Sequence, residues 1–219
     1  AILSQNDDSG RDYVRGFKEG LGDKAKSMVV AEATYEVTDP TVDSQMLKLK
    51  SSGADVFYLM STPKFGAQAI KKAHEIGWKP LTLVVSVASS IEGVLKPAGL
   101  EASQGLVTTA ALKNPGDPAW KDDKVMSEFM AFMKQIGMES RVHESSAVLG
   151  YISAIQMQKL LERCGDDLTR ENLMKQVTNI DEKTLPMLLP GIGVKTSPTD
   201  VSPFHSLRMQ RFQGDSWVL

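Results

Sequence analysis

Hydroxyl and amide side chains follow three predicted strands of this 219-residue chain. Asn6 and Ser9 come after the first strand, Ser61 and Thr62 after the third, and Ser86 after the fourth. These side chains donate or accept hydrogen bonds, and the helices that begin in the same loops add backbone N–H groups that lack helical partners. Together these groups suit a small polar or carboxylate-bearing ligand. Taken singly, each residue is also explained as a helix cap.

The elements that must position these residues form a regular pattern. Short apolar or β-branched runs bounded by turn residues predict strands at 2–5, 28–37, 55–60, 81–87 and 105–110. Between them, apolar residues three and four positions apart predict helices. This alternation with short crossovers indicates an α/β fold with a doubly wound parallel sheet. In the common strand order 2-1-3-4-5, the loops after the first and third strands flank the ligand crevice.

Helix ends carry their own sequence signals. Asp39–Pro40 and Thr62–Pro63 each predict a capping oxygen followed by proline at the first helical position. Gly53 and Gly77 stand where helices end in a left-handed conformation. The first part of the chain therefore looks like one complete domain.

The pattern changes after Thr109. A turn-rich linker at 113–118 is followed by predicted helices at 119–136, 145–163 and 169–177, with no strand between them. The first two are apolar on more than one face, which is typical of buried helices, yet the sequence provides no second sheet to cover them. A last extended segment is expected at 207–212, before a turn at Gly214.

Composition and charge argue against several classes of protein. The 25 Lys and Arg residues against 27 Asp and Glu residues give a net charge of -2 and leave no basic stripe for nucleic acid or an anionic membrane. The apolar runs are too short to span a bilayer, and no signal peptide is recognisable in this chain. The lone Cys164 is expected at a helix end, not in a disulfide or metal site.

The sequence gives little support for an enzyme. His74, His143 and His205 lack the spacing of a metal site or a catalytic motif. The pair Asp7–Asp8 is typical of a magnesium-dependent phosphoacceptor, but such a site needs a carboxylate after the third strand, where this chain has Ser61. We therefore expect no catalysis, no metal and no cofactor.

Eight blocks of sequence resemble one family. They lie at 3–13, 51–57, 69–79, 165–172, 189–192, 196–200, 211–212 and 217–219. These blocks are similar to the branched-chain amino acid type of ABC-transporter solute-binding protein. The resemblance implies a type I periplasmic binding fold in which two lobes close on a small solute and deliver it to ABC permease subunits. It also implies a periplasmic location.

The resemblance further implies how the chain is divided. Residues 1–111 correspond to a complete lobe, 112–203 to the helical tail of another lobe, and 204–219 to a return strand and the C-terminus. The sheet of the other lobe would lie upstream of Ala1, so we expect a C-terminal fragment. Without that sheet, the helices at 119–136 and 145–163 would expose apolar faces, from which we expect self-association.

The binding positions implied by the resemblance differ from those of amino-acid binders. Ser9, Thr62 and Ser146 stand where an aromatic residue is common, and Ser86 stands where an acidic residue holds the ligand's ammonium. An ammonium without an acidic partner is costly to bury. An aromatic acid is therefore preferred over a branched-chain amino acid as the carboxylate-bearing ligand of the interlobe cleft. The alternative is the ligand-sensing domain of a transcriptional or signalling receptor with the same fold.

Overall fold

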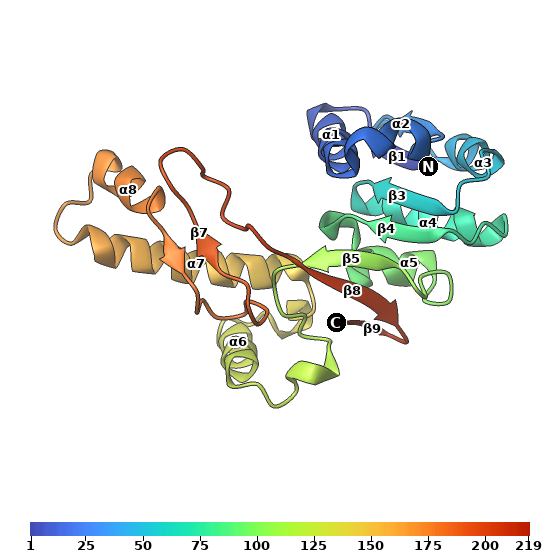
Figure 1. The fold of residues 1–219 in the computed structure, drawn as a ribbon. Coiled ribbons are helices and arrows are strands. Elements are labelled where there is room, and N and C mark those ends of the chain that lie inside the picture. The colour runs from blue at the N-terminus through green and yellow to red at the C-terminus, as the bar shows by residue number, and fades with distance from the viewer. The chain divides into compact units, whose positions relative to one another are not determined.

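The computed structural model describes all 219 residues, which form two compact units (Figure 1). Unit 1 contains Ala1–Thr109 and Met209–Leu219, and unit 2 contains Ala110–Arg208. The chain thus leaves unit 1 once and returns to it for its last eleven residues.

Unit 1 is built on a seven-stranded sheet with the order β2-β1-β3-β4-β5-β8-β9. The first five strands pair in parallel, and β8 and β9 form an antiparallel hairpin. The predicted α/β class and the order 2-1-3-4-5 are therefore confirmed. The strands are β1 (Ile2–Gln5), β2 (Glu32–Tyr35), β3 (Val56–Met60), β4 (Leu81–Val84), β5 (Val107–Ala110), β8 (Arg208–Gln213) and β9 (Ser216–Val218).

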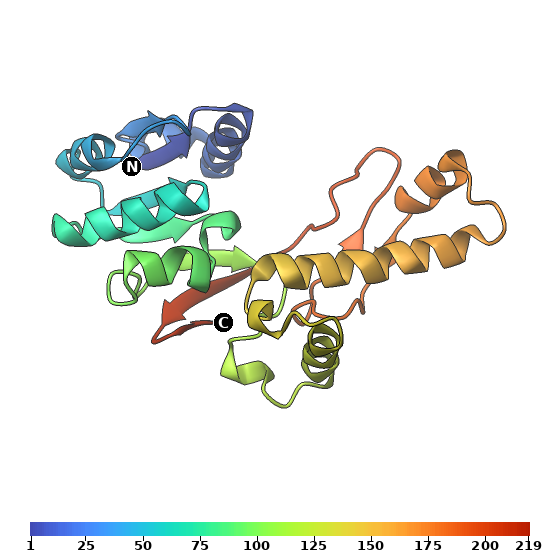
Figure 2. The same cartoon turned by 180° about the vertical axis from the view of Figure 1, so that it is seen from behind.

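Helices lie on both faces of this sheet. Phe17 of α1 stacks on Tyr58 of β3 with ring centroids 4.3 Å apart, while the next residue, Phe57, packs on Trp78 at 4.9 Å. Because successive strand residues point to opposite faces, α1 and Trp78 lie on different sides. Helix α4 contacts α3 and α5 and is seen in front of the strands in Figure 2. The helices are α1 (Asp8–Leu21), α2 (Ala25–Met28), α3 (Asp43–Ser51), α4 (Pro63–Glu75) and α5 (Lys96–Ala98), with short turns η1 (Gly22–Lys24), η2 (Ser86–Ala88) and η3 (Ile91–Leu95).

The core of unit 1 includes residues from both ends of its sequence. Leu3, Leu59 and Val94 are fully buried, and Phe212 and Trp217 join the same apolar cluster from the C-terminal hairpin. Burial of apolar surface on both sides of the sheet is the main stabilising contribution in such a layered fold.

Two predicted helix boundaries differ in outcome. Helix α4 begins at Pro63 as predicted, but the predicted capping oxygen is wrong, because the Thr62 side chain does not cap the helix. The prediction for Asp39–Pro40 is wrong, because α3 begins only at Asp43. Asp39 instead closes the turn after β2 by accepting a 2.9 Å hydrogen bond from the Glu36 N–H, and the fully buried Val42 precedes the helix.

Other boundaries follow the local signals more closely. Gly53 and Gly77 adopt φ values of 74° and 66°, so both left-handed helix ends are confirmed. The strand predicted at 28–37 is shorter, because 25–28 form α2 and only Glu32–Tyr35 pair with β1.

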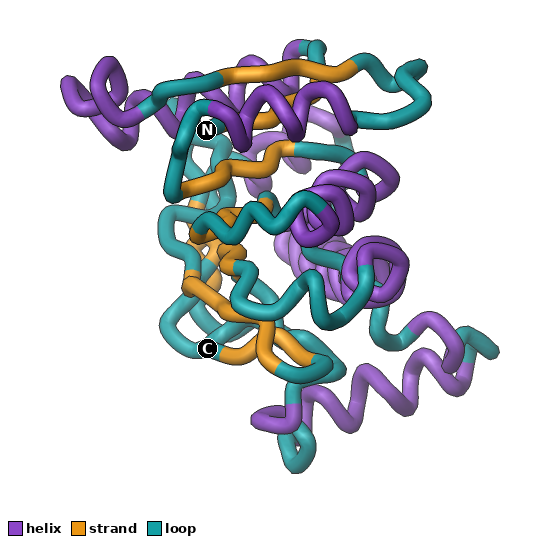
Figure 3. The backbone as a smooth tube through the Cα atoms, turned by 90° about the vertical axis from the view of Figure 1, so that its right-hand side faces the viewer, coloured by secondary structure: helices purple, strands orange, loops and turns teal.

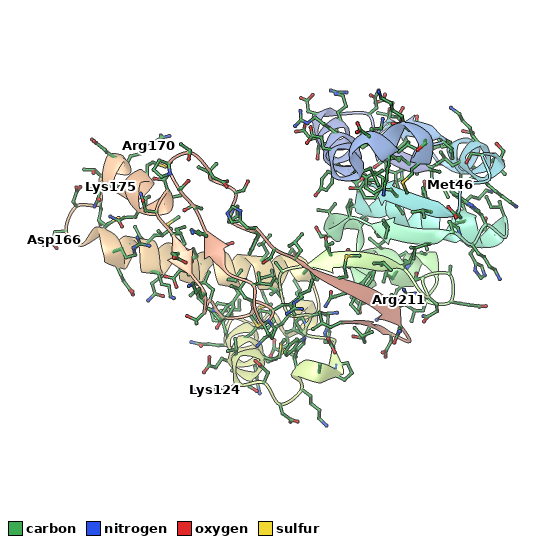
Figure 4. The ribbon with its side chains drawn as sticks, viewed as in Figure 1. Met46, Lys124, Asp166, Arg170, Lys175 and Arg211 are labelled. Carbon is green, nitrogen blue, oxygen red and sulfur yellow. The ribbon has the colours of Figure 1, made fainter.

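The regular structure of unit 2 is mainly helical. Figure 3 distinguishes helices and strands by colour. No strand lies between the three longer helices of unit 2, as predicted. Figure 4 labels Lys124 at the start of α6, Asp166 after α7, and Arg170 and Lys175 on α8. Its elements are η4 (Pro118–Trp120), α6 (Lys124–Gln135), η5 (Glu139–Arg141), α7 (Ser145–Cys164), α8 (Arg170–Val177), β6 (Asp181–Glu182) and β7 (Val194–Lys195).

Helices α6 and α7 of unit 2 bury one side and leave apolar side chains on the other. Phe129 and Val148 are fully buried, and Cys164, also buried, is the last residue of α7, which confirms its predicted place at a helix end. Phe132 and Leu149 are 39% and 52% exposed. None of the helices combines the length and apolar character needed to cross a membrane.

Candidate ligand-binding site

The carboxyl ends of β1, β2 and β3 meet at one edge of the unit 1 sheet. The register pairs Gln5 with Tyr35 and Ser4 with Met60, which places the ends of the three strands side by side. Tyr35 links the following loops, because its carbonyl oxygen accepts the Asn6 N–H at 2.9 Å and its phenol oxygen accepts the Thr62 N–H at 3.0 Å. Hydrogen bonds of Tyr35 therefore connect the loops at this edge of the sheet.

The loop after β1 is held by Asp7. Its Oδ1 accepts the Gly10 N–H at 2.7 Å and caps α1, and the hydrogen bonds from Gly10 and Gln5 lower the pKa of the Asp7 carboxyl. A Cβ atom at position 10 would lie 1.9 Å from the Gln5 carbonyl oxygen. Glycine is therefore required for α1 to begin so close to the end of β1.

The two predicted site residues in this loop are both exposed. The Asn6 side chain donates a hydrogen bond to the Glu36 carboxylate. Ser9 lies in the first turn of α1, and its hydroxyl makes no hydrogen bond. Neither side chain acts as the cap of α1, since Asp7 fills that position.

Tyr35 is the central side chain of the edge. Its ring is 1% exposed and lies 4.3 Å from the ring of Phe65 in the first turn of α4. Its hydroxyl lies 3.2 Å from Gln5 Oε1 and 3.4 Å from Thr62 Oγ1. Burial raises the pKa of the Tyr35 phenol, so the group keeps its proton at neutral pH.

The two predicted residues after β3 have different surroundings. Thr62 is half-buried at the N-terminus of α4, but its side chain does not cap the helix. Ser61 is fully buried, and its hydroxyl has no hydrogen-bond partner. The Ser61 Oγ lies 3.0 Å from the point where a Cβ of Gly66 would stand, so it faces the underside of α4.

The last two predicted residues make no hydrogen bond to this network. Ser86 is exposed at the start of η2, where its carbonyl oxygen accepts the Ser89 hydroxyl at 2.7 Å. Ser146 belongs to unit 2, near the start of α7, and its hydroxyl donates to Glu144 Oε2 at 3.3 Å. A double hydrogen bond from Arg141 to Glu144 lowers the pKa of the Glu144 carboxyl.

The network thus brings together Asn6 and Thr62 through Tyr35. Gln5, Asp7 and Tyr35 were not among the predicted site residues, although they connect the two loops. The strand order 2-1-3 could have indicated Tyr35 as a residue of this edge, because it places the end of β2 beside the end of β1.

A groove runs from this edge along α1. It has a volume of about 590 Å³, and Gln5 and Asn6 line it together with Arg11 and Arg15 of α1. The cationic groups are paired, Arg11 with Asp8 at 2.6 Å and Arg15 with Asp12 at 3.1 Å. The groove therefore has no strong excess of positive charge.

The titratable side chains form no metal centre. No group of three or more His, Cys, Asp or Glu side chains is close enough together to hold a metal ion.

A comparison with protein-family models gives a match over residues 1–216 to a family described as periplasmic binding protein. The chain belongs to this family. The predicted resemblance is therefore confirmed at the level of the family. A search of curated proteins finds no match.

Solved periplasmic binding proteins share the fold. A substrate-binding periplasmic protein from Ralstonia solanacearum is 23% identical, with a TM-score of 0.76 over 96% of this chain and 57% of that one. An ABC-transporter solute-binding protein from R. palustris in complex with 4-hydroxybenzoate is 16% identical, with a TM-score of 0.78 over 99% and 57%. A branched-chain amino acid ABC transporter protein from Thermus thermophilus with bound valine is 13% identical, with a TM-score of 0.76 over 99% and 58%. The chain thus spans less than two thirds of each of these structures.

Proposed function

We propose that this chain is part of an extracytoplasmic solute-binding component of an ABC importer. The observation that carries the proposal is the family match over residues 1–216. It is supported by similar structures that are ABC-transporter binding proteins. In this function the protein binds a solute without changing it and presents it to permease subunits.

We propose a small carboxylate-bearing ligand, with an aromatic acid preferred over a branched-chain amino acid. Ser86 offers a hydroxyl at the position where amino-acid binders are expected to have an acidic residue, so a ligand ammonium would lack a charged partner there. The 4-hydroxybenzoate bound to the R. palustris relative supports an aromatic acid, and the valine bound to the Thermus thermophilus relative represents the other choice.

The proposed binding residues differ in the exposure of their side chains. Asn6, Ser9, Thr62 and Ser86 are exposed or half-buried and lie in the loops that follow the strands of unit 1 or in the first turn of the next helix. Ser146, which belongs to unit 2, stays a prediction from the sequence. Ser61 is proposed with the others from sequence, but its buried hydroxyl faces Gly66 and supports packing beneath α4.

Calorimetric titration with 4-hydroxybenzoate, benzoate, leucine and valine tests the ligand class. We expect binding of the aromatic acids and at least tenfold weaker binding of the amino acids, since burying an unpaired ammonium costs several kcal/mol. Tighter binding of leucine or valine than of both acids would overturn the proposed class.

A pair of threonine variants tests the site. Thr62→Val removes the hydroxyl at the proposed site without much change in shape, and we expect several-fold weaker binding of the acid. Thr41→Val is the matched control, because Thr41 is exposed and makes no hydrogen bond through its hydroxyl. Equal affinities of the two variants would remove Thr62 from the site.

A further inference from the structure

A chain of hydrogen bonds joins the start of α1 to the start of α4. Asp7 accepts the Gly10 N–H through Oδ1 and the Gln5 side-chain amide through Oδ2. The Gln5 Oε1 accepts the Tyr35 hydroxyl at 3.2 Å, and the Tyr35 oxygen accepts the Thr62 N–H at 3.0 Å. Three strand ends are therefore connected through one phenol group.

The chemistry of the Asp7 carboxylate determines which groups donate and which accept in this series of hydrogen bonds. An ionised carboxylate only accepts hydrogen bonds, so the Gln5 amide must turn its NH₂ group toward Asp7 and its oxygen toward Tyr35. The phenol group of Tyr35 has one proton, which it donates to the Gln5 oxygen. The lone pairs of the Tyr35 oxygen remain for the Thr62 N–H, which is the arrangement observed.

Packing holds the phenol in this position. The Tyr35 ring is 1% exposed and contacts the ring of Phe65, three residues after Thr62. Both the ring and the hydroxyl of Tyr35 therefore contact the beginning of α4. A buried ring with two hydrogen bonds has little freedom to move, and it restricts the backbone of Thr62 in turn.

The same contacts explain why Thr62 does not cap α4. Its Oγ1 lies 3.4 Å from the phenol oxygen of Tyr35 and accepts no backbone N–H of the helix. By contrast, Asp7, Asp123 and Thr169 each cap their own helix with a side-chain oxygen. The N–H of Thr62 is therefore held by Tyr35, while its carbonyl oxygen accepts the Gly66 N–H of α4 at 2.9 Å.

We propose that Tyr35 is a positioning residue of the ligand site, which acts by fixing Thr62 relative to the loop after β1. The inference rests on the proposed function, since it assumes that Thr62 contacts the ligand. Tyr35 itself need not touch the ligand, because its ring is buried.

The first experiment needs no ligand. Amide hydrogen exchange measured by NMR compares the wild-type chain with Tyr35→Phe and Tyr58→Phe. Tyr58 is the matched control, since its hydroxyl makes no hydrogen bond and it stacks on Phe17 in a different part of the sheet. We expect exchange of the Thr62 N–H to be at least tenfold faster in Tyr35→Phe and unchanged in Tyr58→Phe. Unchanged exchange in Tyr35→Phe would overturn the proposal.

The second experiment is a double-mutant cycle on the Kd for 4-hydroxybenzoate. Tyr35→Phe should weaken binding about tenfold in the wild-type background and less than twofold in the Thr62→Val background, because its effect passes through Thr62. Tyr58→Phe should have no effect in either background. Equal losses from Tyr35→Phe in both backgrounds would indicate a general structural effect and contradict positioning.

If the proposed function is wrong, the experiments give a different result from the one that overturns the role of Tyr35. If the wild-type protein binds neither 4-hydroxybenzoate nor benzoate, the proposed ligand class is wrong. The exchange measurement then decides alone whether Tyr35 fixes Thr62.

Discussion

The indole Nε1 of Trp217 donates a 2.8 Å hydrogen bond to the carbonyl oxygen of Ser89, a residue 128 positions earlier in the chain. Ser89 follows β4, and Trp217 belongs to β9 at the C-terminus. Trp217 is 3% exposed and packs edge-on against Phe212 with ring centroids 5.4 Å apart. The last strand is thus an integral part of the core of unit 1.

Trp217→Phe should lower the free energy of unfolding by about 1–3 kcal/mol. The variant leaves the Ser89 carbonyl without its donor and removes part of a buried ring. Urea denaturation followed by circular dichroism measures the change. Trp120→Phe is the comparison, because the buried indole N–H of Trp120 has no hydrogen-bond partner and its loss should cost less. A larger loss for Trp120→Phe would contradict the assigned role of the Trp217 bond.

Gly10→Ala and Gly16→Ala should change stability in opposite directions. Both residues lie in α1, but a Cβ at position 10 would come within 1.9 Å of the Gln5 carbonyl oxygen, whereas a Cβ at position 16 meets nothing within 4 Å. We expect Gly10→Ala to cost more than about 3 kcal/mol and Gly16→Ala to add up to about 1 kcal/mol. Thermal unfolding distinguishes them, and a stable Gly10→Ala variant would show that α1 can begin elsewhere.

Protonation of Asp123 should make unit 2 less stable at acidic pH. Its carboxylate lies 2.6 Å from the Nζ of Lys113, whose side chain is only 10% exposed, and it caps α6 through the Met126 N–H at 2.9 Å. The hydrogen bond from Lys113 is the main cause that lowers the pKa of Asp123 in the folded protein. The unfolded chain therefore takes up a proton first, and the stabilisation is present above about pH 4 and lost as the pH falls through the lower folded pKa.

Asp123→Asn should accordingly cost about 1–2 kcal/mol at pH 7 and less at acidic pH. Denaturation at pH 7, 4 and 2.5 measures this dependence. Asp122→Asn is the control, because Asp122 is exposed and makes no ion pair. A loss of the same size at all three pH values would show that the Asp123 charge is unimportant.

The exposed apolar side chains of α6 and α7 should cause self-association. Leu149 and Met157 of α7 are 52% and 44% exposed, and Phe132 of α6 is 39% exposed. Apolar surface of this kind gains free energy when it is covered. We expect the molar mass from light scattering to rise with concentration, and Leu149→Gln with Met157→Gln to reduce this rise.

A leucine on unit 1 provides the control for this prediction. Leu81 of β4 is 46% exposed, so Leu81→Gln makes the same chemical change away from α6 and α7. A wild-type chain that stays monomeric at all concentrations would contradict the prediction, as would equal effects of the two sets of substitutions.

Local signals were sufficient for most elements of unit 1. Apolar runs and helical spacing predicted its five parallel strands, and Gly53 and Gly77 marked two helix ends because only a left-handed backbone continues the chain there. The prediction for Asp39–Pro40 was wrong because turn and cap signals use the same residue types, and the choice between them depended on the buried Val42.

The candidate site depended more on tertiary structure. The sequence indicated which loops carry hydroxyl and amide groups, because side-chain chemistry and chain order are local properties. It did not indicate that Ser61 points under α4 or that Tyr35 joins Gln5 to Thr62, since these relations follow from sheet register and packing between distant segments. The sequence by itself therefore determined the family, the alternation of strands and helices in unit 1 and the polar character of the loops. The tertiary structure alone decided which of these side chains are buried, which are exposed and which are connected.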